Sequence, residues 1–186
     1  MNSTPSSGDG ARNCRIFLES TITQCHKSCF FSKHVPPDLT RDMLTPSRSI
    51  QCHQRTLLLF KSFLDHEDPT CMSHLICFDQ ARHARVQSAK DIAWHLHNLR
   101  SSYGDKRIPS HMLEAINRSL LVLLEDLDGG GSRDAFVELF RSLVVFSKRL
   151  KQARGMVRRI QSIAKQSGIV LPPDTALILH RSESES

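Results

Sequence analysis

The sequence lacks any long hydrophobic run. Its longest apolar stretch, residues 120–124, is far shorter than the roughly 20 residues that a membrane helix requires. The opening MNSTPSSGDGARN has no apolar segment after a basic start, which argues against a secretory signal. Alternation of apolar and polar residues at hairpin spacing and internal repeats are also missing. We therefore expect a soluble, intracellular, all-α protein whose six cysteines are reduced thiols.

Sequence motifs of catalysis are missing as well. There is no G-x-S-x-G elbow, and the Gly129-Gly130-Gly131 run lacks the Gly-Lys-Ser/Thr of a phosphate-binding loop. Glu125, Asp126 and Asp128 gather at a helix end, where like charges can raise the pKa of a carboxyl group, although such turns are usually just solvated. We predict that the protein is not an enzyme and has no catalytic or cofactor-binding residues.

Two groups of cysteines and histidines have the chemistry of zinc ligands, but neither has the usual two tight pairs. They are Cys25, His26, Cys29 and His34 in one group and Cys71, His74 and Cys77 in the other. The first group has no second close pair and the second lacks a fourth ligand. We predict no metal site. A metal-dependent enzyme built around Cys25 is the alternative, and it requires stoichiometric zinc in the purified chain.

Apolar residues recur at spacings of three and four along most of the chain, which predicts a single multi-helix bundle. Within it we expect Ser47 and Ser132 to be N-caps, Leu58 and Leu59 to be buried, and His95 to lie on a solvated face. The predicted helices cover residues 15–31, 47–64, 82–103, 109–127, 132–150 and 155–167. The predicted domain organisation is a disordered tail at 1–13, a helical regulatory region at 14–175 and a flexible tail at 176–186.

Positive charge is concentrated in one stretch. The formal net charge is +6, yet residues 133–167 contain nine basic residues and two acidic ones, a local excess of seven. A plain solvated face is the leading interpretation of this stretch, since no aromatic residues interleave with the charges as a base-stacking platform. The alternatives are contact with an acidic partner, nuclear targeting and weak nucleic-acid binding. The partner contacts that we predict are Arg149, Arg154, Arg158 and Arg159.

Three passages of the sequence follow one another in a recognisable order. The first joins Val35-Pro36-Pro37-Asp38-Leu39 to SIQCHQRTLLLFKSF at 49–63, the second runs from SAKDI at 88–92 to the apolar residues 120–127, and the third holds DAFVEL, GMVR and GIVLP between 134 and 172. Together they resemble the middle homology region of fungal zinc binuclear-cluster (six-cysteine) transcription factors of the nitrate-assimilation regulator type. One departure is Phe60-Lys61-Ser62-Phe63, where that family has His-Arg-Pro-Phe.

The resemblance covers residues 35–173 and implies a regulatory or effector region of a nuclear transcription factor that controls RNA polymerase II transcription. It implies contacts with other regions of such a factor or with the transcription machinery, a homodimer as a further option, and no membrane. The C-x2-C-x6-C cluster cannot be drawn from the cysteines present, so zinc and DNA contact are expected only through a domain absent from this chain. The alternative is a free-standing helical adaptor, or a truncated relic, with no role in DNA binding.

Overall fold

A computed structural model describes residues 44–65, 72–105 and 108–184, and this part of the chain is helical without any strand. The elements are α2 (Leu44–Asp65), α3 (Met72–Tyr103), the 3₁₀ helix η2 (Ser110–Met112), α4 (Leu113–Leu124), α5 (Ser132–Ser147), α6 (Lys151–Gln166) and α7 (Pro173–Ser184). The predicted all-α class is confirmed, and no helix among the described residues is long and apolar enough to cross a membrane.

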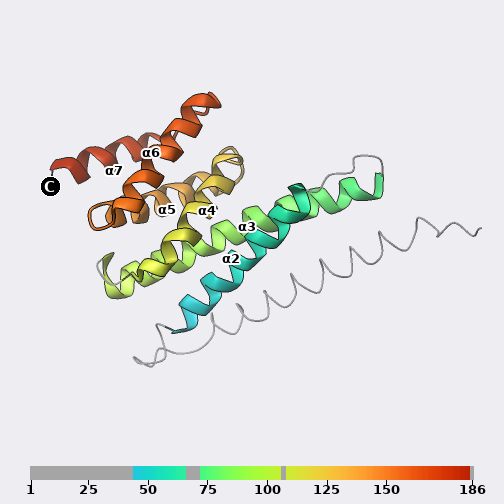
Figure 1. The fold of residues 1–186 in the computed structure, drawn as a ribbon, viewed down its shortest axis with the longest axis horizontal. Helices are drawn as coiled ribbons and strands as arrows, with labels where there is room; N and C mark the ends of the chain where they lie inside the picture. The colour runs from blue at the N-terminus through green and yellow to red at the C-terminus, as the bar shows by residue number, and fades with distance from the viewer. Residues whose placement is uncertain (1–43, 66–71, 106–107, 185–186) are drawn as a thin grey trace, which may run out of the picture.

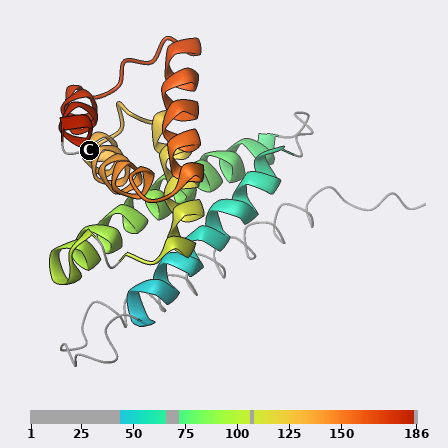
Figure 2. The same ribbon diagram turned by 60° about the vertical axis from the view of Figure 1, so that its left-hand side comes forward.

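The helices pack as a bundle around α4 and α5 (Figures 1 and 2). Helices α2 and α3 lie side by side, and α4 packs against both of them. Helix α5 contacts α3 and α4 on one side and α6 and α7 on the other, while α6 also reaches α4. This arrangement places α2, α4 and α6 around one side of the bundle, where the candidate site lies.

The core forms because α4 is apolar almost all round, as its sequence predicts. Nine of the twelve residues of α4 are buried, including Ile116, Leu120 and Leu123 with no exposed area. Helix α5 faces them with Phe136 and Phe140, whose rings stack with centroids 6.0 Å apart. Burial of each such side chain contributes about 1.5 to 3 kcal/mol, so the contact between α4 and α5 contributes substantially to stability.

The end of α6 is set by Gly168, as expected from the sequence. Its φ of +66° lies in the left-handed region that favours glycine. The Ile169 N–H donates to the Ala164 carbonyl at 2.8 Å, and the Gly168 N–H donates to the Lys165 carbonyl at 3.3 Å. These two bonds form a Schellman motif, which directs the chain away from α6.

Neither predicted serine cap is formed. Helix α2 begins at Leu44, so Ser47 lies inside it, with its Oγ 3.1 Å from Nε2 of His111. Gly131 occupies the N-cap position of α5 in a left-handed conformation, and Ser132 becomes the first residue of the helix. The Ser132 hydroxyl therefore donates to Oδ2 of Asp126 at 2.6 Å instead of capping the backbone.

Burial also differs from the prediction at three positions. Leu58 and Leu59 remain 39% and 38% exposed, because the stripe of α2 that packs inward runs through Ile50, Leu57 and Phe60. His95, expected on the solvated face, is only 2% exposed. Helix α3 is covered by α2, α4 and α5, so its solvated face is narrower than that of a helix packed on one side.

The C-terminal elements differ from the prediction as well. Helix α5 ends at Ser147 and α6 begins at Lys151, four residues before the expected start at Gly155. A helix, α7, occupies most of the segment predicted to be a flexible tail at 176–186. Pro173 suits the first position of a helix, and the Thr175 hydroxyl donates to the Pro172 carbonyl at 2.6 Å. Ile178 and Leu179 then pack against the core.

The predicted tail at 1–13, the helix at 15–31 and the group of Cys25, His26, Cys29 and His34 lie outside the described residues, as does Cys71 of the second group. In the part of the chain that the structure describes, no three His, Cys, Asp or Glu side chains gather as metal ligands.

Candidate functional site

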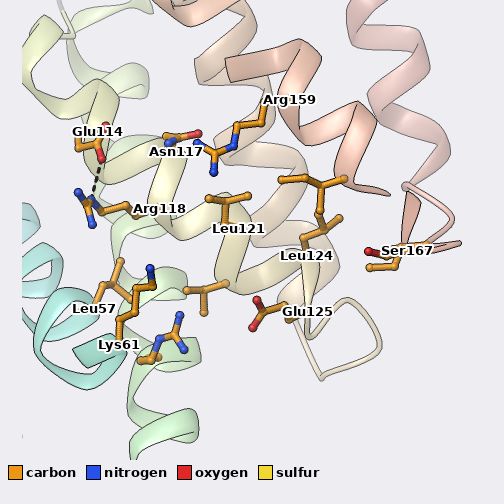
Figure 3. A pocket seen from close by; sticks show the side chains of 14 residues that line it. Leu57, Lys61, Glu114, Asn117, Arg118, Leu121, Leu124, Glu125, Arg159 and Ser167 are labelled. Carbon is orange, nitrogen blue, oxygen red and sulfur yellow. Dashed lines mark ion pairs between the residues drawn. The ribbon is translucent and has the colours of Figure 1, made fainter. Parts of the chain in front are cut away.

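A groove of about 480 Å³ opens on the side of the bundle formed by α2, α4 and α6 (Figure 3). Its apolar lining is Leu57, Leu121, Val122, Leu124, Ile163 and Ile169. Its charged lining is Lys61, Arg85, Glu114, Arg118, Glu125 and Arg159. Residues distant in the sequence meet here because α4 lies between α2 and α6 and contacts both. The groove thus combines apolar walls with four cations and two carboxylates.

The charges of the groove are only partly balanced. Arg118 Nε lies 2.8 Å from Glu114 Oε1 one turn earlier on α4, and this contact is an ion pair without well-directed hydrogen-bond geometry. Arg85 and Arg159 form no ion pair in the described part of the chain, and the buried Arg85 Nε donates to no acceptor. Glu125 lies near the Ser167 end, away from Arg118 (Figure 3). One end of the groove therefore carries an excess of positive charge.

Asn117 is a polar residue of α4 in the wall of the groove. It is only 6% exposed, and its buried Oδ1 accepts no hydrogen bond. Arg159 extends from α6 toward Asn117 (Figure 3). A buried acceptor without a donor costs about 1 to 3 kcal/mol, so this wall gains stability when a donor approaches.

A second hollow, also of about 480 Å³, continues the groove beyond α4. The two hollows share Leu124, Glu125 and Ile169. The second one runs over the α4–α5 turn, past the carboxylate of Asp128, to Val170, which is 87% exposed. The residues that line the first hollow are therefore net positive, and those that line the second, which include Arg133, are net negative.

The four arginines predicted as partner contacts do not form one surface. Arg154 and Arg158 are four residues apart on α6 and share a face, whereas Arg159 is rotated by about 100° and lines the groove. Arg149 lies in the α5–α6 link with its guanidinium 5.3 Å from the centre of the Phe146 ring. The Arg154 Nε–H donates to the Ser147 carbonyl at 2.9 Å. All four side chains are exposed.

The structure assigns different roles to the members of the acidic turn. Asp126 accepts the Ser132 hydroxyl, and its backbone carbonyl accepts the Gly129 N–H at 2.9 Å. Glu125 and Asp128 are exposed. Asp126 therefore holds the turn together, while its two neighbours supply negative charge to the second hollow.

A buried pair of histidines lies between α2 and α3 and was not predicted from the sequence. His53 and His95 are 4% and 2% exposed, their ring centroids are 5.8 Å apart, and His53 Nε2 is 3.9 Å from Asp91 Oδ2. Spacing does contain a signal, since His95 follows Ile92 by three residues and precedes Leu99 by four on the inward stripe. The pair belongs to the α2–α3 interface.

Comparison with known proteins shows sequence similarity between this chain and a transcriptional regulator. Over 107 residues the chain is 34% identical to the notoamide biosynthesis transcriptional activator notL′ of Aspergillus versicolor. The match includes 58% of this chain but only 17% of the relative, so the chain spans about a sixth of that protein. No family model and no solved structure matches. The chain is thus similar to part of a fungal transcriptional activator.

Proposed function

We propose that this chain is a regulatory or effector region of a fungal-type transcription factor that controls RNA polymerase II transcription in the nucleus. The observation that carries the proposal is the 34% identity to a fungal transcriptional activator over 107 residues. The order of the passages between 35 and 173 supports the finer assignment to the zinc binuclear-cluster type and, within it, to the nitrate-assimilation regulators.

Protein–protein or intramolecular contacts are the proposed mechanism. Arg154 and Arg158 supply an exposed basic surface on α6, which contains no acidic residue that would neutralise it, and Arg149 is a further exposed cation in the α5–α6 link. Such a surface attracts acidic partners over a distance of about 10 Å at ordinary salt. The proposed partners are other regions of a full-length factor or the transcription machinery, with a homodimer as a further arrangement.

Zinc enters the proposal only through a separate DNA-binding domain. The family's cluster requires cysteines three residues apart, and no two of the six cysteines have that spacing. Cys52, the cysteine whose side chain the structure describes, is a half-buried residue within α2. The donor set does not fit a zinc pair, so we assign no zinc-dependent step and no direct reading of DNA bases to this chain.

Tethering to DNA tests the proposal directly. The full chain is fused to a heterologous DNA-binding domain in yeast, and transcription of a reporter with the matching sites is compared with that from the DNA-binding domain alone. A reproducible increase or decrease is expected. The control is a fusion with Leu120→Asp, which puts a charge into the core and unfolds the bundle. Equal reporter levels from all three fusions, at equal protein abundance, would show that the folded chain has no regulatory activity.

A further inference from the structure

The groove between α2, α4 and α6 is open, and its walls are formed by side chains of these helices and by Arg85. Its walls leave polar groups unused, since Arg85 Nε and Asn117 Oδ1 are buried without hydrogen-bond partners. The groove also leaves Leu121 and Ile163 only half-buried, on the two helices that form its sides. Apolar walls beside unpaired cations are suited to an amphipathic ligand of opposite charge.

The shape of the groove favours a peptide over a compact metabolite. Two hollows of about 480 Å³ each adjoin, since Leu124, Glu125 and Ile169 line both of them. A drug-sized ligand is usually enclosed in a single concave pocket. An open, elongated groove between helices is typical of surfaces that accept an amphipathic helix, whose apolar residues at i, i+3, i+4 and i+7 enter the groove.

The charges set the polarity of the ligand. The lining of the first hollow has four cations and two carboxylates, whereas the lining of the second has three carboxylates and one cation, Arg133. Acidic residues are therefore favoured at one end of a bound helix and disfavoured at the other. We infer that the groove docks an amphipathic helix of a partner protein, with the acidic end of that helix beside Arg159 and its neutral or basic end at the α4–α5 turn.

This inference rests on the proposed function, because it names the partner class for the contacts of a regulatory region. It also separates Arg159 from the other arginines on α6. Lys165, also on α6, is likewise exposed and positively charged, but it does not line the groove. The two positions form a matched pair, because reversing either charge changes the net charge of the protein by the same amount.

A display library of amphipathic helices tests the inference without knowledge of the natural partner. The apolar positions of the library are fixed at helical spacing, and the flanking positions are varied among Asp, Glu, Gln, Lys and Arg. Selection is carried out on the full purified chain and on the Arg159→Glu and Lys165→Glu variants. Circular dichroism checks that both variants fold, as is expected of substitutions at exposed positions.

The wild-type chain should select helices with acidic residues concentrated at one end. For the best of these peptides, Arg159→Glu should weaken binding by about fivefold or more, and Lys165→Glu should leave the affinity within about twofold. Equal weakening by both variants would overturn the inference, because attraction to the net charge would then explain binding. Failure to select any helix with an acidic end would also overturn the inference. The inference would likewise be overturned if no peptide binds while citrate or inorganic phosphate does, and if this anion binding is lost in Arg159→Glu.

Failure of this experiment and failure of the proposed function can be told apart. The tethered reporter does not depend on any chosen peptide, so a reporter response without peptide binding would reject the groove and keep the regulatory role. Peptide binding with the expected Arg159 dependence, without a reporter response, would leave the chain as a helical adaptor with a defined docking groove.

Discussion

Glu138 offers a quantitative test of the packing between α3 and α5. Its Oε2 lies 2.9 Å from Arg100 Nη2, 3.5 Å from His97 Nδ1 and 3.6 Å from Arg141 Nη1. The side chains of Glu138 and Arg100 are only 14% and 15% exposed, so solvent screens this ion pair weakly. Glu138→Gln keeps the shape of the side chain and one hydrogen bond but removes the negative charge.

The magnitude follows from the difference between charged and neutral hydrogen bonds. A hydrogen bond to a charged group contributes about 1.5 to 3 kcal/mol, against about 0.5 to 1.5 kcal/mol for a neutral one. Asp105 then remains the nearest carboxylate to Arg100, with Oδ1 at 3.8 Å from Nε. We expect Glu138→Gln to lower the free energy of unfolding by about 1 to 2 kcal/mol.

Glu114→Gln is the matched control. Glu114 Oε1 lies 2.8 Å from Arg118 Nε, nearly the same separation, but the two side chains are 42% and 35% exposed. An exposed pair four residues apart on a helix contributes about 0.3 to 0.5 kcal/mol. Urea unfolding followed by far-ultraviolet circular dichroism measures both free energies. Equal losses for the two variants would refute the reasoning that burial, and not separation, sets the strength of these pairs.

Two further predictions concern the glycines in and after α6 and the hydroxyl of Ser132 at the start of α5. Gly155→Ala, in the exposed middle of α6 with no atom within 4 Å of the new Cβ, should raise the free energy of unfolding by about 0.5 to 1 kcal/mol, whereas Gly168→Ala, at a φ of +66°, should lower it by about 1 to 2 kcal/mol. Thermal unfolding of both variants checks the opposite signs, and a shared sign would contradict the assigned end of α6. Ser132→Ala removes a buried hydroxyl from the Asp126 carboxylate and should cost about 1 to 2 kcal/mol, as measured in urea. A loss below about 0.3 kcal/mol would show that this bond does not hold the turn.

The positions of most helices could be predicted because their apolar residues recur at three and four. In α3, the inward residues Val86, Ile92, Leu96 and Leu99 are all buried, as the spacing indicates. The prediction was wrong at His95, because a periodic pattern shows that a helix has an inner face but does not show how many neighbours cover it. Three helices cover α3, and they enclose a residue that one neighbour would leave exposed.

The groove and the last helix could not be predicted for two different reasons. The groove brings together Leu57, Asn117 and Arg159, each from a different helix, and only the packing of α4 between α2 and α6 places them near one another. Helix α7 contains few apolar residues after Pro172-Pro173, and its docking on α5 stabilises it more than its own sequence does. The four predicted arginines do not lie on one surface, because successive residues of α6 point in different directions. The spacing of the buried residues of α6 already indicated which side of the helix faces inward.

We propose that the folded chain regulates transcription through contacts made by basic residues on α6 and in the α5–α6 link. The most direct measurement is reporter transcription from the DNA-tethered full chain, compared with a variant in which Arg149, Arg154, Arg158 and Arg159 are all replaced by Gln. We predict that the wild-type chain changes reporter output and that the variant, equally abundant and equally helical, loses most of this effect. A folded wild-type fusion with the same output as the DNA-binding domain alone would contradict the regulatory role, and an unchanged effect in the variant would contradict the assigned contacts.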